Sequence, residues 1–395
     1  MKKVIIVTSD AFPNGMATSR RIKCYARALR EGGIETEVLV CRRTERFGVE
    51  PKNIAGSGMF KDIPFNYISN TPLRENNIFI RQLNDWRDTI STKRYLLDRL
   101  ENGDVLFLYL EDIYKESLFI RAAHKKGASC IRDLCELPYS TRNDTWRARI
   151  LRRIELRRIF PRLDGVISIS STLKRLATEH CKPSCKHLQV PILVDYEDYY
   201  LRDESEKSII PYIFHSGTLS QQKDGIIGML AGFGKAICEM PDPVHFISTG
   251  NIEDSSCQEE IQKVIDKYKI QDLVHFTGYL EDNEVQSYLS KASLVIVNKI
   301  RTQQNHYCFS TKLAEYLAAA KPVITTDFGE AARWLTDKQD AYIVKSGDTD
   351  ALSKAIVYAF SHREESRRVG LAGQELCRQN FDYHQWTQQL CNIVV

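Results

Sequence analysis

Two segments in the second half of the chain carry charged residues where an apolar run gives way to a helix. In "HSGTLSQQKDG", Gly217 ends the apolar run and Lys223 stands six residues later, ahead of a helix expected near Asp224. A glycine turn followed by a lysine at a helix start suits a diphosphate, because the first helical N–H groups can bind an anion. Taken singly, Lys223 would more often be a solvated surface lysine.

The second segment is "STKLAEYLAAAKPVI", in which one acid interrupts an apolar helical pattern. Ser310 and Thr311 are favoured N-cap residues, so the backbone N–H groups of the first turn are expected to point outward. Glu315 is too deep to cap this helix but close enough to its start to accept hydrogen bonds from paired sugar hydroxyls. We therefore expect the helix start to bind phosphates and Glu315 to bind a ribose. The simpler interpretation is a partly exposed acid on an amphipathic helix.

A third segment, "SDAFPNGMATSRRI", follows the first apolar run. Gly15 allows a close backbone approach, and a helix expected from Ala17 would offer free N–H groups to an anion. Arg20 and Arg21 add positive charge. The glycine-rich dinucleotide fingerprint G-x-G-x-x-G is missing, so this segment alone favours an ordinary strand–helix turn.

The three segments lie in a chain where short apolar runs alternate with helical stretches, and these elements are expected to position them. The runs begin at Val4, Glu37, Val105, Ser129 and Gly165 in the first half, and at Tyr212, Val244, Val274, Leu294, Pro322 and Ala341 in the second. Such a pattern predicts parallel sheets covered on both faces, so we expect two doubly wound α/β domains. The charged stretch between Tyr200 and Pro211 is the expected linker. Ligands should lie beyond the carboxyl ends of the strands, in a cleft between the facing domains.

Length and composition set the limits of these expectations. The 395 residues suit two domains, and the net charge of +4 argues against wholesale nucleic-acid binding. No apolar run is long enough to span a membrane, and the apolar N-terminal run is interpreted as a buried strand rather than a signal sequence. The eleven cysteines are scattered, which favours reduced thiols in a cytoplasmic protein.

One cysteine cluster raises the question of a metal. The segment "HCKPSCKH" places His180, Cys181, Cys185 and His187 close together. These residue types can bind zinc, but structural zinc sites usually space their ligands more regularly. A helix end with small buried thiols is therefore the favoured interpretation, and we expect no metal and no cofactor.

A basic helix is predicted in the first half of the chain. Residues 142–162 hold eight arginines against Asp144 and Glu155, with an apolar side that includes Trp146 and Phe160. Such a helix is typical of contact with anionic lipid headgroups at a membrane surface. The alternative is a solvated arginine face that covers an ordinary core stripe.

Taken together, the segments resemble the retaining glycosyltransferases of the GT-B fold, in particular glycosyltransferase family 4, the group 1 glycosyl transferases. "FSTKLAEYLAAAKPVITTDFGE" resembles that family's F-P-x-K-L-x-E-Y-L-A-x-G-K-P-V-V-x-T-x-x-G-E segment, and "HSGTLSQQKDGIIGMLAGF" resembles its G-x-L-x-x-x-K-D-G motif. "DGVISISSTLKRL", "VPILVD" and "FPNGMATSRRI" resemble parts of its acceptor domain.

The resemblance implies an acceptor-binding Rossmann-like domain over residues 1–200 and a nucleotide-sugar-binding domain over residues 201–375. A final helix, residues 376–395, would pack back on the first domain. The donor would be bound by the following residues: Gly15, Gly217, Thr218, Lys223, Gly278, Tyr279, Ser310, Thr311, Lys312 and Glu315. The acceptor side would include Arg20, Arg21, Cys135 and Glu136, and the catalytic residues would be Lys223 and Glu136.

Three positions depart from the family pattern. Tyr307 stands where many members have a second glutamate, Thr218 where many have arginine, and Cys135 where many have histidine. These departures leave open a catalytically inactive nucleotide-sugar-binding scaffold; a sugar-nucleotide epimerase of the same fold fits less well. The implied activity is transfer of a sugar with retention to a sugar or lipid-linked sugar acceptor, without a metal. By analogy, surface polysaccharide or glycolipid synthesis on the inner membrane face would follow.

Overall fold

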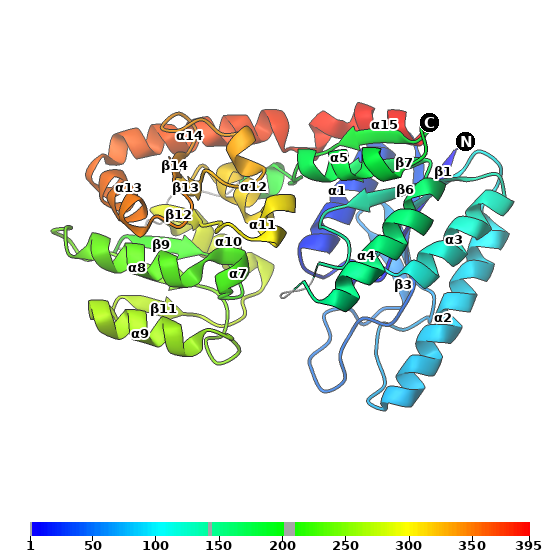
Figure 1. Cartoon of the computed structure of the whole chain (residues 1–395), viewed down its shortest axis with the longest axis horizontal. Coiled ribbons are helices and arrows are strands. Elements are labelled where there is room, and N and C mark those ends of the chain that lie inside the picture. The colour runs from blue at the N-terminus through cyan, green and yellow to red at the C-terminus, as the bar shows by residue number, and fades with distance from the viewer. Residues whose placement is uncertain (1, 141–143, 201–209) are drawn as a thin grey trace. The chain divides into compact units, whose positions relative to one another are not determined.

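The computed structural model describes residues 2–140, 144–200 and 210–395, which divide into two compact units (Figure 1). Unit 1 holds the chain up to Leu193 together with Tyr383–Val395, and unit 2 is Val194–Asp382. Each unit is one sheet with helices on both faces, so the predicted pair of doubly wound α/β domains is confirmed.

The sheet of unit 1 has the strand order β3-β4-β2-β1-β5-β6-β7-β8. The strands are β1 (Lys3–Thr8), β2 (Glu35–Val40), β3 (Ser57–Phe60), β4 (Ile63–Tyr67), β5 (Val105–Tyr109), β6 (Ser129–Leu134), β7 (Gly165–Ser168) and β8 (Lys186–Gln189). Neighbouring strands are parallel except β3 and β4, which pair antiparallel at one edge. This edge hairpin is a correction to the expectation of wholly parallel sheets.

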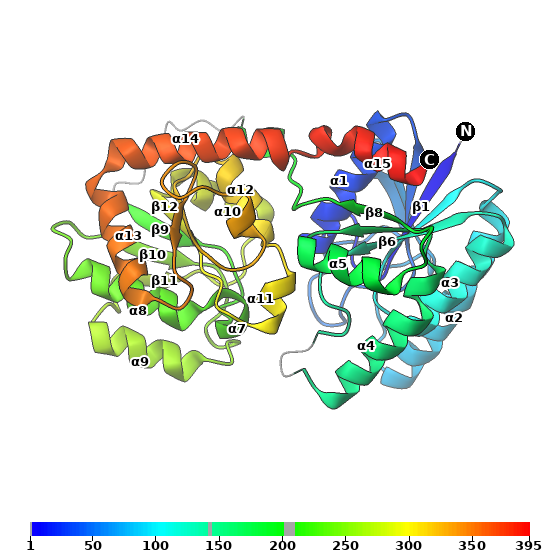
Figure 2. The same cartoon turned by 45° about the horizontal axis from the view of Figure 1, so that its top comes forward.

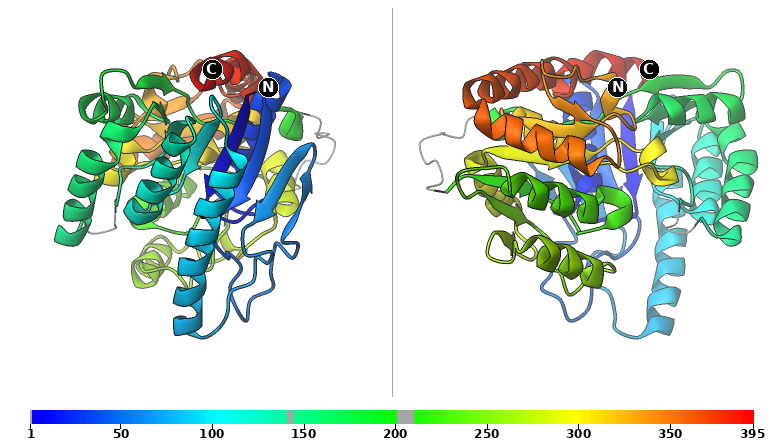
Figure 3. Two further views of the ribbon diagram at one scale, coloured as in Figure 1. Left: turned by 90° about the vertical axis from the view of Figure 1, so that its right-hand side faces the viewer. Right: turned by 60° about the vertical axis from the view of Figure 1, so that its left-hand side comes forward.

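Right-handed crossovers decide which face each helix of unit 1 covers. Figure 2 shows α1 and α15 on one face of the sheet and α3, α4 and α5 on the other. In the left view of Figure 3, α2, α3 and α4 lie in a row. The helices are α1 (Ala17–Glu31), α2 (Ile78–Arg99), α3 (Ile113–Lys125), α4 (Trp146–Arg158), the short η1 (Phe160–Arg162), α5 (Ser171–His180), η3 (Tyr383–Trp386) and α15 (Thr387–Val394).

The sheet of unit 2 has the strand order β11-β10-β9-β12-β13-β14, and all its strands are parallel. The strands are β9 (Tyr212–His215), β10 (His245–Ser248), β11 (Val274–Phe276), β12 (Leu294–Val297), β13 (Val323–Thr326) and β14 (Tyr342–Val344). The helices are α6 (Glu197–Tyr200), α7 (Gln221–Asp224), α8 (Ile226–Ile237), α9 (Gln258–Tyr268), α10 (Asp282–Lys291), α11 (Gln303–Tyr307), α12 (Thr311–Ala318), η2 (Ala331–Arg333), α13 (Thr349–Ser361) and α14 (Arg363–Asn380).

The unit boundaries fall at residues 193 and 382, whereas the sequence placed them at 200 and 375. The backbone N–H of Val194 donates to the carbonyl of Phe381, so the first and last segments of unit 2 are hydrogen-bonded to each other. The tail is not one helix: α14 ends at Asn380, and η3 and α15 follow separately. Most of the predicted linker lies outside the described residues.

Each unit has its own apolar core. In unit 1, α15 contributes Leu390, Ile393 and Val394 to the core beneath α1. In unit 2, α8 supplies Met229 and Phe233 to the core. Among the described helices, none combines the length and the apolar character that a membrane crossing requires.

Candidate functional site

The site predicted from the sequence lies at the switch point of the sheet in unit 2. From β9 the chain proceeds through α8 to β10 on one side, whereas β12 and β13 continue on the other side. In such sheets the helices leave opposite faces at this point, and ligands bind beyond the carboxyl ends of the two central strands. His215 ends β9, and Asn298 and Lys299 directly follow β12.

A buried carboxylate with two lysines occupies this point. The Nζ atom of Lys312 lies 2.7 Å from Oδ1 of Asp224, and Nζ of Lys299 lies 3.3 Å from the same oxygen. The Lys312 ammonium also approaches Nε2 of His215 at 3.3 Å, while Nδ1 of His215 pairs with the Ser248 hydroxyl at 2.9 Å. The cluster therefore joins the ends of β9, β10 and β12 to the start of α12.

The electrostatics of the cluster set two lysine ammonium groups against buried carboxylates. Burial, with the nearby Lys312, lowers the pKa of His215 to about 3, so its ring is neutral at physiological pH. Burial alone would raise the pKa of Asp224, but Lys312 and Lys299 outweigh it and hold this pKa far below its usual value. Glu315 also acts on Lys312 as a nearby negative charge, so two carboxylates face the ammonium groups of Lys299 and Lys312. The exposed ammonium of Lys223 beside them is the charge that an anionic ligand can balance.

Gly217 lets the loop after β9 lie directly against this cluster. A Cβ atom at this position would lie 2.6 Å from both Lys312 Nζ and His215 Cε1, so any side chain would displace one of them. The N–H of Gly217 donates to Oγ1 of Thr249 at 2.7 Å, which fixes the loop on the end of β10. The sequence predicted a glycine turn here, and its physical reason is this close approach.

The start of α12 faces the same edge of the sheet. Ser310 occupies the predicted N-cap position, but its side chain makes no capping hydrogen bond. The Tyr316 hydroxyl accepts a hydrogen bond from the N–H of Ser216 at 2.7 Å, which holds α12 against the loop after β9. Glu315 is buried on the second turn, where the sequence placed it, and Thr311 is half-buried at the first.

Lys223 and Thr218 are the predicted donor-binding residues that are exposed in the segment after β9. Among the described residues, the Lys223 ammonium has no hydrogen-bond or ion-pair partner, whereas its carbonyl accepts from Lys299 at 2.8 Å. Lys223 lies in the short α7, and the left-handed Gly225 separates α7 from α8. The single helix expected near Asp224 is therefore two helices.

Gly278 and Tyr279 follow β11 at the same edge of the sheet. The N–H of Gly250, after β10, donates to the carbonyl of Gly278 at 2.9 Å. Gly278 has a left-handed φ of 76°, and a Cβ atom there would meet nothing within 4 Å. Tyr279 is exposed, so its ring is accessible to a ligand.

In unit 1, the corresponding strand ends carry a closed network around Asp133. Nε of Arg21 lies 3.1 Å from Asp133, and the other guanidinium nitrogens donate to the carbonyls of Pro191 and Val190 as well as to this carboxylate. The Tyr25 hydroxyl donates to Asp133 at 2.7 Å. Arg21 is thus buried and anchors α1, which differs from the ligand-facing position predicted for it.

The other acceptor-side residues lie around this network. The Cys135 thiol donates to Asp133 at 2.7 Å, and burial raises the pKa of this thiol. Glu136 is exposed, and Arg20 is half-buried. A Cβ atom at Gly15 would lie 2.0 Å from Oγ of Ser19, so this turn also requires a glycine.

Sequence reasoning missed His215, Asp224 and Lys299. Asp224 precedes Gly225 and was taken only as the approximate start of a helix. Its position between Lys223 and the apolar α8 was the sequence signal that could have identified it. His215 stands at the end of an apolar run, where a buried polar side chain points beyond the strand. Nothing local in the sequence indicated that Lys299 and Lys312 share one carboxylate.

Comparison with known proteins agrees with this geometry. Residues 210–362 match the protein family described as "Glycosyl transferases group 1", which is the part of the chain that carries the cluster. No curated protein sequence matches the chain significantly.

Solved structures with the same fold cover the whole chain. Sucrose-phosphate synthase from Thermosynechococcus elongatus has 14% identity and a TM-score of 0.74, over 100% of this chain and 98% of that one. A glycosyltransferase from Rickettsia africae has 14% identity and a TM-score of 0.66, over 100% and 97%. HepE of Anabaena, in complex with UDP-glucose, has 14% identity and a TM-score of 0.69, over 99% of both chains. The predicted GT-B fold is confirmed, and the match to the group 1 family lies within unit 2.

Proposed function

We propose that this chain is a glycosyltransferase that transfers a sugar from a nucleoside-diphosphate sugar to an acceptor hydroxyl, with retention at the anomeric carbon. The observation that carries the proposal is the pair of lysines on Asp224, set beside the start of α12. Helix N–H groups and the exposed ammonium group of Lys223 match the two phosphates of the donor. Buried Glu315 would accept hydrogen bonds from the ribose hydroxyls.

The chemistry would be mainly electrostatic. As the bond between the anomeric carbon and the diphosphate breaks, negative charge develops on the leaving oxygen. Lys223, whose ammonium is exposed, and the first-turn N–H groups of α12 would stabilise that charge. The acceptor hydroxyl would attack from the same face and pass its proton to the leaving phosphate, so that no protein nucleophile is needed.

Unit 1 would bind the acceptor. Glu136 is exposed after β6, and the half-buried Arg20 lies on the first turn of α1, so we assign both to the acceptor side. Arg21 has no direct part in this proposal because its guanidinium is taken by Asp133 and two carbonyls. Tyr307, Thr218 and Cys135 would alter local contacts and leave the diphosphate site intact.

We also propose that the reaction needs no metal ion, because two lysines and a helix start can neutralise the diphosphate. Transfer measured in excess chelator should proceed at the full rate. Abolition of transfer by chelator, with recovery on adding Mg²⁺, would contradict this part of the proposal.

A membrane surface is the proposed location of the acceptor. Four apolar side chains of α4 are exposed, in contrast to the covered core stripe that was the alternative: Trp146, Ile150, Leu151 and Ile154. The start of α2, on the same face of the sheet, exposes further apolar side chains: Ile78, Phe79, Leu83 and Trp86. Exposed arginines accompany the apolar groups of α4, a combination that suits anionic headgroups and a lipid-linked acceptor. Arg142 lies outside the described residues.

Vesicle binding tests this location. The chain should co-sediment with anionic vesicles in a salt-sensitive manner, and Trp146→Glu should weaken that binding. Tyr279→Glu, an exposed aromatic in unit 2, is the control. Equal recovery of all three proteins with neutral and anionic vesicles would contradict the proposal.

A thermal-shift screen tests the donor proposal. Because a ligand that binds only the folded state stabilises it by mass action, one of the UDP-, GDP-, ADP- and TDP-sugars should raise the melting temperature. UDP-glucose comes first because HepE was solved with it. Glu315→Ala should reduce the shift, and release of the nucleotide with transfer to an acceptor distinguishes an enzyme from a binding scaffold.

A further inference from the structure

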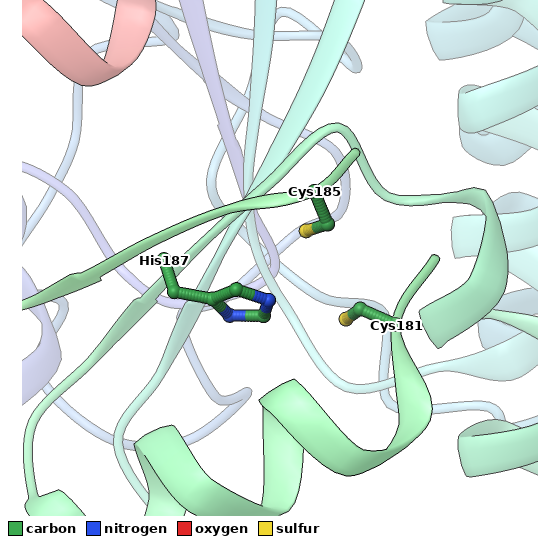
Figure 4. A group of neighbouring side chains, drawn as sticks. All are labelled: Cys181, Cys185 and His187. Atoms are coloured by element: carbon green, nitrogen blue, oxygen red, sulfur yellow. The ribbon is translucent and has the colours of Figure 1, made fainter. Parts of the chain in front are cut away.

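Three metal-binding side chains meet at the edge of unit 1, remote in the sheet from its proposed acceptor residues. One ligand atom from each of Cys181, Cys185 and His187 lies within 4.8 Å of the other two. Figure 4 shows both sulfur atoms and the imidazole ring pointing into one space. Cys185 is buried, and Cys181 and His187 are half-buried.

The local fold explains why these residues converge. Cys181 caps the C-terminus of α5, and the N–H of Cys185 donates to the carbonyl of Lys182 at 3.0 Å, closing a tight turn between the two thiols. Cys185 directly precedes β8 and His187 is the second residue of that strand, so alternation places both side chains on one face. The spacing of these residues in the sequence gave no sign of a metal site. The turn and the helix end nevertheless bring the three side chains together.

The imidazole of His187 shows that the cluster is incomplete as it stands. Its Nδ1 atom is buried and has no hydrogen-bond partner in the described parts of the chain. A buried polar atom without a partner carries a desolvation cost that a metal ion would remove. The C-terminus of α5 also carries partial negative charge, which favours a cation beside Cys181.

We propose that Cys181, Cys185 and His187 bind one Zn²⁺ ion that fastens the end of α5 to the edge strand β8. Two thiolates and one imidazole form a ligand set that Zn²⁺ prefers, and a water molecule would complete the tetrahedron. Binding releases the two thiol protons to solvent, and the two thiolates balance the charge of the ion. The turn lies before β8, at the amino edge of the sheet, whereas Cys135 and Glu136 follow β6 at the carboxyl edge. The proposed site is therefore separate from the acceptor residues of unit 1 and from the donor site in unit 2.

Cobalt titration of the whole chain, prepared reduced and metal-free, is the test. We expect one Co²⁺ per chain, with the intense visible absorption of a tetrahedral ion and a near-ultraviolet thiolate band, both abolished by one equivalent of Zn²⁺. Zn²⁺ alone should raise the melting temperature, and nucleotide-sugar binding should be unchanged. Cys185→Ser should abolish the thiolate band or weaken Co²⁺ binding by at least tenfold.

His187→Gln keeps both thiols and so serves if Cys185→Ser does not fold; it should also weaken Co²⁺ binding by at least tenfold. Cys238→Ser removes an exposed thiol from unit 2 and should bind Co²⁺ like the unaltered chain. The proposal is overturned if no saturating tetrahedral spectrum appears, or if all these proteins give the same one. Formation of a Cys181–Cys185 disulfide in the presence of Zn²⁺ would also overturn it.

Discussion

Each unit has a buried carboxylate near the carboxyl edge of its sheet, and each carboxylate pairs with cationic side chains. The two carboxylates differ in the groups that pair with them. In unit 1, Asp133 faces one guanidinium, and its remaining capacity is taken by the hydroxyl of Tyr25 and the thiol of Cys135. In unit 2, Asp224 faces two ammonium groups. The first cluster is closed, whereas the second lies beside the exposed Lys223, whose ammonium group an anion can balance.

The difference teaches where to look for a ligand in a sheet of this kind. Position at the carboxyl edge is common to both clusters, so position alone does not distinguish an anchor from a binding site. An exposed cation beside the cluster does, because a buried ion pair with all donors occupied offers nothing to a substrate. The predictions below disturb one cluster or the other, beginning with the largest expected effect.

Asp133→Ala should destabilise the protein by about 3–5 kcal/mol, because it leaves the buried Arg21 guanidinium without a counter-ion. The free energy of unfolding in urea measures this loss. Asp350→Ala removes an exposed carboxylate paired with Lys235 and should change the free energy of unfolding far less, because an exposed ion pair is screened by water. Similar effects of the two substitutions would show that the Asp133 network is not a closed anchor.

Lys223→Ala should lower turnover by about 10²-fold, the scale of losing one group that stabilises the transition state. The ammonium is exposed, so the melting temperature should hardly change. Lys235→Ala, which changes a half-buried lysine on α8 paired with Asp350, is the control and should keep full turnover. Near-native turnover of Lys223→Ala would remove this residue from the site.

His215 should make stability depend on pH in unit 2. Its folded pKa of about 3 is below the ordinary value near 6.5, so the unfolded chain takes up a proton first as the pH falls. The His215 contribution is present above pH 6.5 and declines toward pH 3, with a loss of about 2 kcal/mol by pH 5. Unfolding in urea at pH 7.5 and pH 5.0 should show a smaller loss for His215→Gln; equal losses would mean that His215 is not buried as a neutral ring.

Gly217→Ala should weaken donor binding by about tenfold, since the new methyl group displaces Lys312 or His215. Gly228→Ala is the control, because a Cβ atom there meets nothing closer than 3.8 Å and alanine favours the helix. Calorimetric titration with the donor found in the thermal screen gives both dissociation constants. An unchanged dissociation constant for Gly217→Ala would separate the loop after β9 from the donor.

The continuous apolar runs predicted the strands well. Each of the runs named from the sequence contains a strand, from Val4 in β1 to Ala341 before β14. The strands that were missed are short and lack such runs: β3 is "SGMF", β4 is "IPFNY" and β8 is "KHLQ". Their pairing depends on neighbours that are distant in sequence, so no local pattern identifies them.

The candidate site was predictable only in its local parts. Lys223, Gly217 and the start of α12 follow from motifs within a few residues of one another. The pairing of Asp224 with Lys312, and of Arg21 with Asp133, joins residues far apart in the chain, and burial decides their charge states. Arg21 is an example: its place at a helix start predicted a ligand-facing arginine, but its guanidinium is buried against Asp133.

A structure of the chain with its nucleoside-diphosphate sugar tests the central claim most directly. The account predicts the diphosphate within hydrogen-bonding distance of Lys223 and the first-turn N–H groups of α12, with the ribose hydroxyls on Glu315. A nucleotide bound elsewhere, with the Lys312–Asp224–Lys299 cluster remote from its phosphates, would contradict it.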